Sequence, residues 1–176
     1  MSIRGSVTMR IRYAVTLNTR CVGYVLLIYC PNNVVMRVGS LGETSLCRGM
    51  YLYVGSANIR NPVTRVLRHF GKGKKMHWHV DYLTEKCIPF LASLCFGRGE
   101  DYLYDLLVSL DVVKPAVLGF GSSDRVLHKT HLFKLLAEDS TAIVSLIDTL
   151  VKTCNRVEVI SISDRFCLSR VLRGQL

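Results

Sequence analysis

Cationic and aromatic side chains follow one another closely between residues 65 and 82, and their types suit contact with phosphate and bases. Guanidinium and ammonium groups bind phosphate oxygens, and an indole ring can stack on a base. The segment therefore indicates nucleic-acid binding. The binding candidates are its basic and aromatic side chains: Arg68, Lys72, Lys74, Lys75, His77, Trp78 and His79.

A helix is expected to carry the first of these residues. Asn61-Pro62 is a typical helix start and Gly71 a typical helix end. Apolar residues recur between them with the spacing of one helix face, which predicts the buried stripe: Val63, Val66, Leu67 and Phe70. Arg65, Arg68 and His69 are then expected on the opposite, accessible side. On spacing alone, a solvated helix face is the favoured interpretation of these three.

The lysine-bearing loop and the His-Trp-His run that follow it allow several interpretations. The loop at residues 71–75 contains no carboxylate to neutralise its lysines, which suits phosphate contact or simple solvent exposure. In an extended chain His77, His79 and Asp81 would project to one side as metal ligands. In a helix His77 would instead pair with Asp81, one turn later, and Trp78 would lie beside Tyr82. A structural use of at least one histidine is the favoured interpretation.

Glu100 is the acidic residue most clearly placed for chemistry. Residues 100–110 predict a helix with Leu103, Leu107 and Leu110 on one stripe, and Glu100 lies on that stripe. A carboxylate aimed inward is costly unless it is paired or binds a metal. The alternative is a glutamate that the helix dipole favours in the first turn.

Several extended segments must hold these residues in place. Residues 21–30, 33–38 and 50–54 are separated by turn signals and predict an antiparallel meander. This arrangement would bring Tyr24 and Tyr53 close together. Residues 87–96 predict a central buried strand, and residues 10–17 show a weaker strand pattern. After residue 138 the pattern predicts a helix (141–153), a strand (157–161) and a last helix (164–172).

Composition narrows the class of protein. The chain has 176 residues, 49% hydrophobic and 20% charged, which suits one folded domain with an appendage. No apolar run reaches the roughly 18 residues of a membrane span, and we expect a cytoplasmic protein that does not bind membranes. The seven cysteines form no metal-binding pair, and most are expected to be small buried side chains, although an internal disulfide stays open.

The net charge of +10 is unevenly distributed. Residues 1–80 contain twelve Lys or Arg and one acid, whereas the rest contains eleven and twelve. Such a one-sided field attracts polyanions, with nucleic acid the first candidate and an anionic membrane surface the second. A basic soluble protein without such a partner is the simpler alternative.

Several blocks in a fixed order resemble the GIY-YIG endonuclease superfamily. They run from Tyr24 through Gly49-Met50-Tyr51-Leu52-Tyr53-Val54-Gly55 and Arg65-x-x-Arg68-His69 to the His-Trp-His-Val-Asp-Tyr run, Gly119-Phe120-Gly121-Ser122-Ser123-Asp124 and His131-Leu132-Phe133. The chain is specifically similar to a mainly archaeal branch of uncharacterised domains that also occur fused to endonuclease III-type glycosylases. The first motif departs from the usual pattern, because Gly23 directly precedes Tyr24.

The resemblance implies an α+β fold with a small three-stranded antiparallel sheet flanked by helices. It places this nuclease domain at residues 1–137, and residues 138–176 are expected to form an extension packed on it. It also implies catalytic roles for five residues. Tyr24 and Tyr53 would surround the scissile phosphate, Arg65 would stabilise the developing charge, His69 would assist proton transfer, and Glu100 would bind one Mg²⁺ or Mn²⁺ ion.

We therefore expect a metal-dependent endonuclease that acts on structured or damaged DNA. A module that keeps the fold and binds nucleic acid without cutting it is the alternative from a different class. A nuclease that processes RNA is the third candidate.

Overall fold

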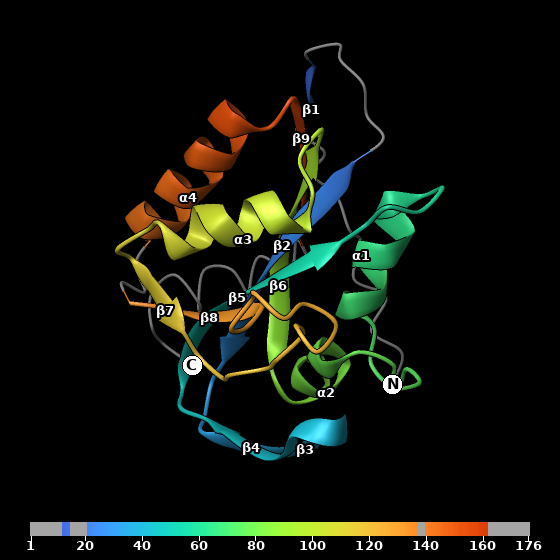
Figure 1. Cartoon of the computed structure of the whole chain (residues 1–176), viewed down its shortest axis with the longest axis vertical. Coiled ribbons are helices and arrows are strands. Elements are labelled where there is room, and N and C mark those ends of the chain that lie inside the picture. The colour runs from blue at the N-terminus through green and yellow to red at the C-terminus, as the bar shows by residue number, and fades with distance from the viewer. Residues whose placement is uncertain (1–11, 15–20, 137–139, 162–176) are drawn as a thin grey trace.

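The computed structural model describes residues 12–14, 21–136 and 140–161 of the 176-residue chain and has an α+β fold (Figure 1). Its helices are α1 (Pro62–Phe70), α2 (His79–Lys86), α3 (Glu100–Val108) and α4 (Ser140–Thr153), with a 3-10 turn at Gly39–Leu41. Its strands are β1 (Arg12–Ala14), β2 (Val22–Cys30), β3 (Val34–Val38), β4 (Gly42–Leu46), β5 (Gly49–Ser56), β6 (Ile88–Phe96), β7 (Val113–Pro115), β8 (Leu132–Leu135) and β9 (Arg156–Ser161).

The main sheet has seven strands in the order β1-β9-β6-β2-β5-β8-β7, and every strand pair in it is antiparallel. The predicted α+β class is confirmed, but the small three-stranded sheet is wrong. Strand β2 lies in the middle with β5 and β6 on its two sides, and the later strands β8 and β9 extend the sheet beyond these neighbours. The apolar segments after residue 86 therefore widen one sheet.

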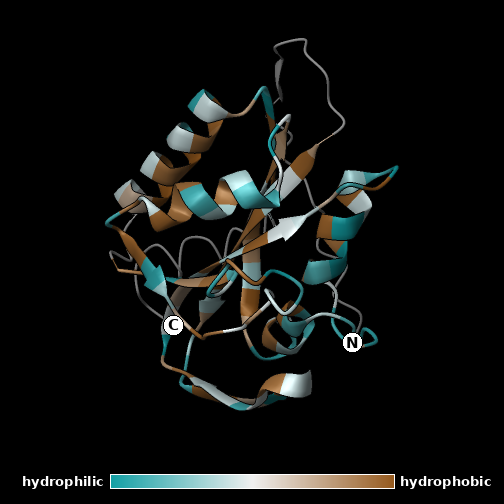
Figure 2. Ribbon diagram, in the orientation of Figure 1, coloured by the Kyte–Doolittle hydropathy of each residue, from teal (hydrophilic) through white to brown (hydrophobic). Residues whose placement is uncertain are grey.

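Strand β2 is buried on both faces, which explains its unbroken apolar sequence. Tyr24, Leu26 and Ile28 point into one core with α1 and α2, whereas the intervening residues point into a second core with α3 and α4. Figure 1 shows α3 and α4 together over one face of the sheet, and Figure 2 shows hydrophobic residues along the central strands. Among the described residues, no helix is long and apolar enough to cross a membrane.

The predicted antiparallel meander is only partly correct. Strands β2 and β5 pair directly, but β3 pairs with β4 in a separate two-stranded sheet. The chain reverses between them through the 3-10 turn, where Gly39 and Gly42 have φ values of 42° and 73°, a region that favours glycine. Strand β4 was not predicted, because Gly42–Leu46 lacks the β-branched and aromatic run that marked the other strands.

Of the C-terminal elements, strand β9 joins the main sheet and helix α4 packs on it. Helix α4 and strand β9 were predicted at residues 141–153 and 157–161, and both are present. Strand β9 pairs with β6 on one side and β1 on the other. The third predicted element, the helix at 164–172, lies outside the described residues. The division of the chain at residue 137 stays a prediction.

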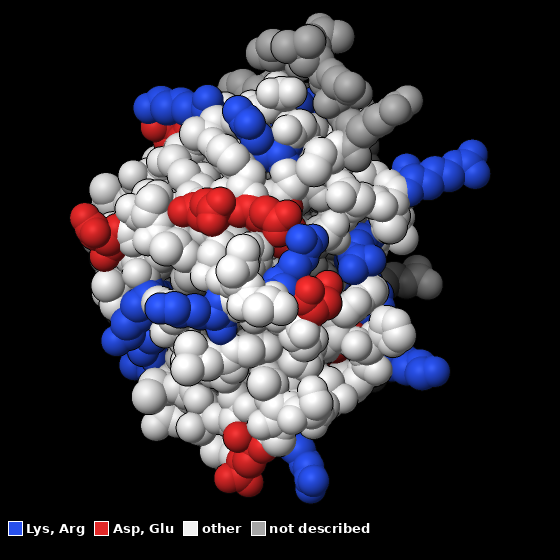
Figure 3. All heavy atoms as spheres, in the orientation of Figure 1, with Lys and Arg blue, Asp and Glu red and all other residues white. Residues whose placement is uncertain are grey.

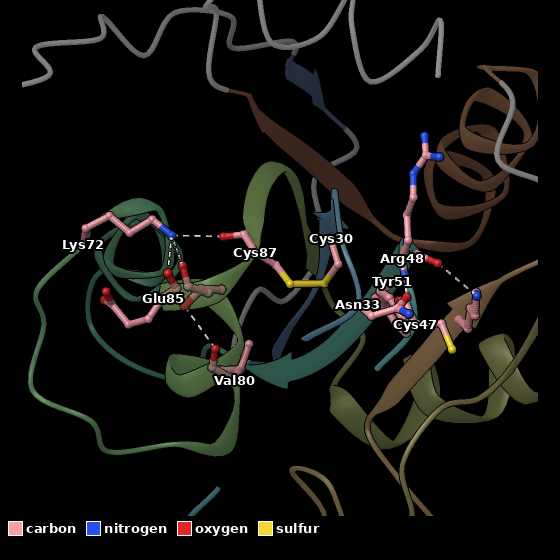
Figure 4. The surroundings of a disulfide bond; sticks show 11 residues. Cys30, Asn33, Cys47, Arg48, Tyr51, Lys72, Val80, Glu85 and Cys87 are labelled. Atoms are coloured by element: carbon pink, nitrogen blue, oxygen red, sulfur yellow. Dashed lines mark hydrogen bonds between the residues drawn. A yellow bond between two sulfur atoms is a disulfide. The ribbon is translucent and has the colours of Figure 1, made fainter. Parts of the chain in front are cut away.

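Two disulfides connect segments that are distant in sequence. Cys30 at the end of β2 is bonded to Cys87 between α2 and β6 (Figure 4), and Cys95 of β6 is bonded to Cys154 after α4. The sequence left an internal disulfide as a possibility, and the structure contains two among its described residues. Of the remaining cysteines, Cys21 and Cys47 are exposed free thiols, and Cys167 lies outside the described residues.

Candidate functional site

The centre of the site is a buried contact between β2 and α1. The Tyr24 hydroxyl oxygen lies 2.8 Å from Nε2 of His69, and the two side chains are 2% and 1% exposed. A buried imidazole needs a hydrogen-bond partner, and Tyr24 supplies one. The prediction that His69 lies on the accessible side of its helix is therefore wrong.

The error lies in the register of the helix face. Helix α1 begins at Pro62 and ends at Phe70 as predicted, but its two buried residues are Val66 and His69. Leu67, which was expected in the buried stripe, is 38% exposed. The spacing of apolar residues predicts that Leu67 is buried and that His69, a polar residue, is exposed. It contains no information about the Tyr24 hydroxyl on β2, which provides a buried partner for His69.

Tyr53 on β5 is the second tyrosine of the site. Its ring centroid lies 6.2 Å from that of Tyr24. The rings of Tyr53 and Phe120 meet in a T-shaped arrangement with their centroids 6.3 Å apart. Gly55 is the cross-strand neighbour of Tyr24, and the Tyr24 ring lies across it. The Tyr-Val-Gly sequence thus provides one catalytic candidate and the space for the other.

Arg65 and Arg68 both lie against the ring of Trp78. Their guanidinium carbons are 4.3 Å and 4.6 Å from the centroid of that ring, within the range of cation–π contact. Burial raises the pKa of Tyr24 and of Tyr53, and the charge of Arg65 acts in the opposite direction on both. Its Nε atom is buried and has no hydrogen-bond partner among the described residues.

Glu100 approaches from the other core, at the first residue of α3. The helix docks closely because Gly23 has no side chain: a Cβ there would lie 2.6 Å from Leu103 and 2.9 Å from the backbone of Gly99. The glycine that the first motif carries directly before Tyr24 therefore has a packing role. It allows the first turn of α3, which carries Glu100, to lie against the beginning of β2.

The Glu100 carboxylate has two cationic or polar neighbours. Its Oε1 is 3.4 Å from Nδ1 of His131, and its Oε2 is 3.7 Å from an Nη of Arg125. Burial raises the pKa of Glu100, with Arg125 acting in the opposite direction. Glu100 also raises the pKa of both site tyrosines. Direct contacts therefore join Tyr24 to His69 and to Tyr53, while Arg65 and Glu100 act on the two tyrosines through their charge.

The two tyrosines and His69 are neutral in the free protein at neutral pH. Burial raises the pKa of Tyr24 far above its usual value, and neighbouring Tyr53 adds to the shift. Burial, then Glu100, raises the pKa of Tyr53. Burial lowers the pKa of His69 to about 4, although Asp81 opposes the shift. A phenol and a neutral imidazole thus share the hydrogen bond.

Glu100 is the one carboxylate among the five catalytic candidates and the only metal ligand that the sequence predicted. A carboxylate oxygen is a preferred ligand of Mg²⁺, which commonly keeps several waters, so one protein ligand is sufficient. Burial raises the pKa of Glu100, which disfavours its negative charge, and Arg125 at 3.7 Å partly compensates for that charge. In the described part of the chain, no three His, Cys, Asp or Glu side chains are grouped to hold a metal.

His77, His79 and Asp81 do not form the metal site that an extended chain would have allowed. Helix α2 begins at His79, so the extended arrangement that would align the three is absent. Asp81 is fully buried and accepts hydrogen bonds from Arg68 Nη1 at 2.7 Å and from the backbone N–H groups of His77 and Trp78. Its oxygens are therefore already used.

Two of the lysine candidates have structural partners. Lys72 donates to the carbonyls of Thr84, Glu85 and Cys87 at the end of α2 (Figure 4). Lys74 lies 3.5 Å from the Glu85 carboxylate and is 8% exposed. The lysine loop thus has a carboxylate neighbour after all, which comes from the following helix.

The other nucleic-acid-binding candidates differ in exposure. Lys75 and His77 are exposed, and the His77 ring meets the Trp78 ring edge-on at 5.1 Å. Arg68 bonds Asp81 and the carbonyl of Lys75, so it anchors the loop. His79 turns toward the interior, where its Nδ1 accepts a hydrogen bond from the backbone N–H of Gly121.

Sequence reasoning missed four participants of the site: Asp81 as a partner of Arg68, Phe120 against Tyr53, Arg125 and His131 beside Glu100. The tight loop at residues 119–124 was recognisable, but its contacts were not. Gly119 and Gly121 have φ values of 74° and 76°, and Gly121 packs on the Tyr53 ring. The loop closes over that tyrosine.

The surface around α3 is acidic. Figure 3 shows acidic side chains gathered over this helix. A hollow of about 440 Å³ lies beside it, and three of its lining residues are Asp101, Asp105 and Asp124. Arg125 and His128 line the same hollow, so its charge is mixed.

Comparisons with known proteins give one family and no characterised relative. No curated protein and no solved structure matches the chain. A family model described as "Domain of unknown function DUF123" matches residues 23–156, which covers the Tyr24 to His131 site and more than half of the sequence. The chain therefore belongs to the DUF123 family.

Proposed function

We propose that this protein is a metal-dependent endonuclease of the GIY-YIG type that cuts structured or damaged DNA. The observation that supports this best is the 2.8 Å contact between Tyr24 and His69, next to Tyr53 and within the fields of Arg65 and Glu100. Phosphodiester hydrolysis needs an attacking water, a proton acceptor and positive charge at the phosphate. Solvent supplies the water, Tyr24 and His69 are the proton acceptors in this proposal, and Arg65 is the positive charge.

The side chains divide the reaction as follows. With the His69 proton on Nδ1, Tyr24 donates its hydroxyl proton to Nε2 across their 2.8 Å contact and accepts a hydrogen bond from the attacking water. As water oxygen bonds to phosphorus, the water proton passes to Tyr24 and the Tyr24 proton to His69. The bond from phosphorus to the leaving oxygen breaks, that oxygen takes a proton from solvent, and His69 releases the proton it gained to solvent. Arg65 donates to the phosphate oxygens whose negative charge grows in the transition state.

Glu100 would hold the metal ion, Mg²⁺ or Mn²⁺. When bound, such an ion supplies positive charge that polarises a phosphate oxygen. Arg125 lies 3.7 Å from Glu100 and provides positive charge at the carboxylate in the free protein. The Oε1 atom of Glu100 lies 3.4 Å from Nδ1 of His131.

The nucleic acid would pass over the surface formed by Arg65, Lys75 and His77, next to the half-buried Trp78. Arg65 and Trp78 lie next to each other, and Lys75 and His77 are exposed beside them. The phosphate backbone would contact the cations, and an unpaired base could stack on an aromatic ring. Lys72 and Lys74 support α2 in this arrangement and do not contact the substrate.

A cleavage panel tests the proposal. The full-length protein is incubated with flap, junction and plasmid DNA and with structured RNA, each with Mg²⁺, Mn²⁺ or EDTA. We expect cuts in DNA that require metal. Arg65→Ala and Glu100→Gln are expected to reduce the rate by about 100-fold or more. Arg60→Ala and Glu43→Gln, which change exposed side chains of the same charge, are the matched controls.

The possible outcomes separate the candidate functions. Metal-dependent products that persist in Arg65→Ala and Glu100→Gln would overturn the site assignment. Products from RNA alone would replace the DNA substrate with RNA. Salt-dependent binding without cleavage of any substrate would favour the module that binds nucleic acid without cutting it, and the burial of Tyr24 and Tyr53 in the free protein is the observation that favours this second function.

A further inference from the structure

Asp81 lies behind His69, on the side away from Tyr24. Its carboxylate is fully buried, and its Oδ1 accepts a hydrogen bond from Arg68 while its Oδ2 accepts backbone N–H groups at 2.9 and 3.0 Å. Burial alone would raise the pKa of Asp81, but the bond from Arg68 and the two backbone bonds outweigh it and lower that pKa. The group is a fixed negative charge inside the protein.

His69 has one nitrogen toward each neighbour. Nε2 lies 2.8 Å from the Tyr24 hydroxyl oxygen, and Nδ1 lies 3.8 Å from Asp81 Oδ1. That Nδ1 atom is buried and has no hydrogen-bond partner within the described residues, so the carboxylate is the charge it faces. Burial disfavours a charged imidazolium, with smaller contributions from Lys74, Arg68 and Arg65, so the ring is neutral and carries one proton.

The position of that proton decides what Tyr24 offers to a substrate. If the proton is on Nε2, His69 donates to the Tyr24 oxygen, and the Tyr24 O–H is directed outward as a donor. The lone pair of Nδ1 then faces the Asp81 charge, which is unfavourable. If the proton is on Nδ1, its N–H dipole points toward Asp81, and Nε2 accepts the Tyr24 O–H. The oxygen lone pairs of Tyr24 are then free to accept a hydrogen bond from water.

We propose that Asp81 is a positioning residue that holds His69 in the Nδ1–H tautomer and thereby makes Tyr24 a hydrogen-bond acceptor toward the attacking water. The physical logic is that the partner of one imidazole nitrogen determines which nitrogen carries the proton. The tautomer stands on the geometry of the free protein alone. Its use in catalysis rests on the proposed endonuclease function.

The tautomer is measured directly by long-range ¹H–¹⁵N correlation of the histidine rings in ¹⁵N-labelled full-length protein at neutral pH. The His69 ring is assigned as the one that disappears in His69→Gln. We expect the Nδ1 of His69 to show the shift of a protonated nitrogen and its Nε2 that of an unprotonated one. A wild-type His69 with the proton on Nε2 would overturn the inference without any change to Asp81.

Two variants separate the charge of Asp81 from its packing. Asp81→Asn keeps the shape and removes the charge, and we expect the His69 proton to move toward Nε2. Arg68→Gln removes the main partner of the carboxylate but leaves the carboxylate itself, and we expect the wild-type tautomer. A folded Asp81→Asn that keeps the Nδ1–H form, or an Arg68→Gln that shifts as far as Asp81→Asn, would contradict the role of the charge.

The link to catalysis has its own measurement. In Asp81→Asn the cleavage rate at saturating DNA is expected to fall about 100-fold, with little change in Kd, because the water-accepting state of Tyr24 is lost. Asp81→Glu is expected to restore part of the rate. An unchanged rate would overturn the catalytic part of the inference. A wild-type protein that shows the Nδ1–H tautomer but cuts no substrate would disprove the proposed function and leave the positioning of His69 intact.

Discussion

The ring of Tyr24 lies across the backbone of Gly55, its cross-strand neighbour, so closely that a Cβ on Gly55 would be 2.4 Å from the Tyr24 hydroxyl oxygen. No real Cβ contact is that short, so any side chain at this position displaces the tyrosine or moves the strands apart. The place of the Tyr24 hydroxyl beside His69 therefore depends on a residue that has no chemistry of its own.

Gly55→Ala tests this dependence. We expect a loss of about 1–3 kcal/mol in the free energy of unfolding, as for other overpacked cores, together with loss of the Tyr24–His69 hydrogen bond. Denaturant unfolding and the His69 ring shifts measure the two effects. Gly71→Ala is the matched control, because its nearest neighbour would be at 3.6 Å and its φ is −78°. Equal stability in the two variants would contradict the packing argument.

Tyr24→Phe removes the hydroxyl and leaves Nε2 of His69 buried without its partner. We expect cleavage to fall by about 100-fold or more and stability to fall by about 1–3 kcal/mol. Tyr29→Phe is the control within the same strand, since Tyr29 is also 2% exposed but its hydroxyl bonds Arg48. Rates are compared at saturating substrate. A fully active Tyr24→Phe would exclude the hydroxyl from the reaction.

The burial of His69 predicts acid sensitivity. Its pKa is about 4 in the folded protein against 6.5 in the unfolded chain. Below pH 6.5 the unfolded state gains a proton that the folded state does not, so stability falls as pH drops toward 4, by up to about 1.4 kcal/mol per pH unit. In His69→Gln, the free energy of unfolding should fall less steeply between pH 6.5 and pH 4 than in the wild type. His77→Gln, which alters an exposed ring, should keep it.

Lys72 and Lys75 should respond differently to neutralisation. Lys72→Met removes a donor to three carbonyls at the end of α2, and we expect about 1–2 kcal/mol of destabilisation with unchanged DNA affinity. Lys75→Met should leave stability unchanged and reduce the slope of log K against log salt by about 0.9, the loss of one phosphate contact. Binding titrations at several salt concentrations measure the slope. A loss of DNA affinity in Lys72→Met together with a loss of stability in Lys75→Met would contradict both assignments.

The disulfide between Cys30 and Cys87 should contribute to stability through the unfolded state. It closes a sequence separation of 57 residues, and its loss in Cys30→Ser is expected to cost about 2–4 kcal/mol. Thermal unfolding with and without a reductant measures the effect. Cys47→Ser, at an exposed free thiol, should change nothing. A Cys30→Ser variant whose Tm equals that of the wild type in oxidising buffer would show that this bridge does not stabilise the fold.

Local patterns in the sequence were sufficient for most of the elements. Asn61-Pro62 and Gly71 located α1, and apolar runs located β2, β5, β6 and α4. These elements are specified by turn chemistry and periodicity, which act over a few residues. The order of the strands in the sheet was not accessible in this way, because pairing between β6 and β9 or between β5 and β8 depends on segments that are far apart in the chain.

The sequence by itself determined that Tyr24, Tyr53, Arg65, His69 and Glu100 are the residues to examine, because their motifs occur in a recognisable order. Only the tertiary structure decided that His69 is buried against Tyr24, that Asp81 stands behind it, and that Lys72 serves a helix end. The physical reason is that a polar side chain can be buried wherever a distant partner satisfies it, and helical spacing carries no information about that partner.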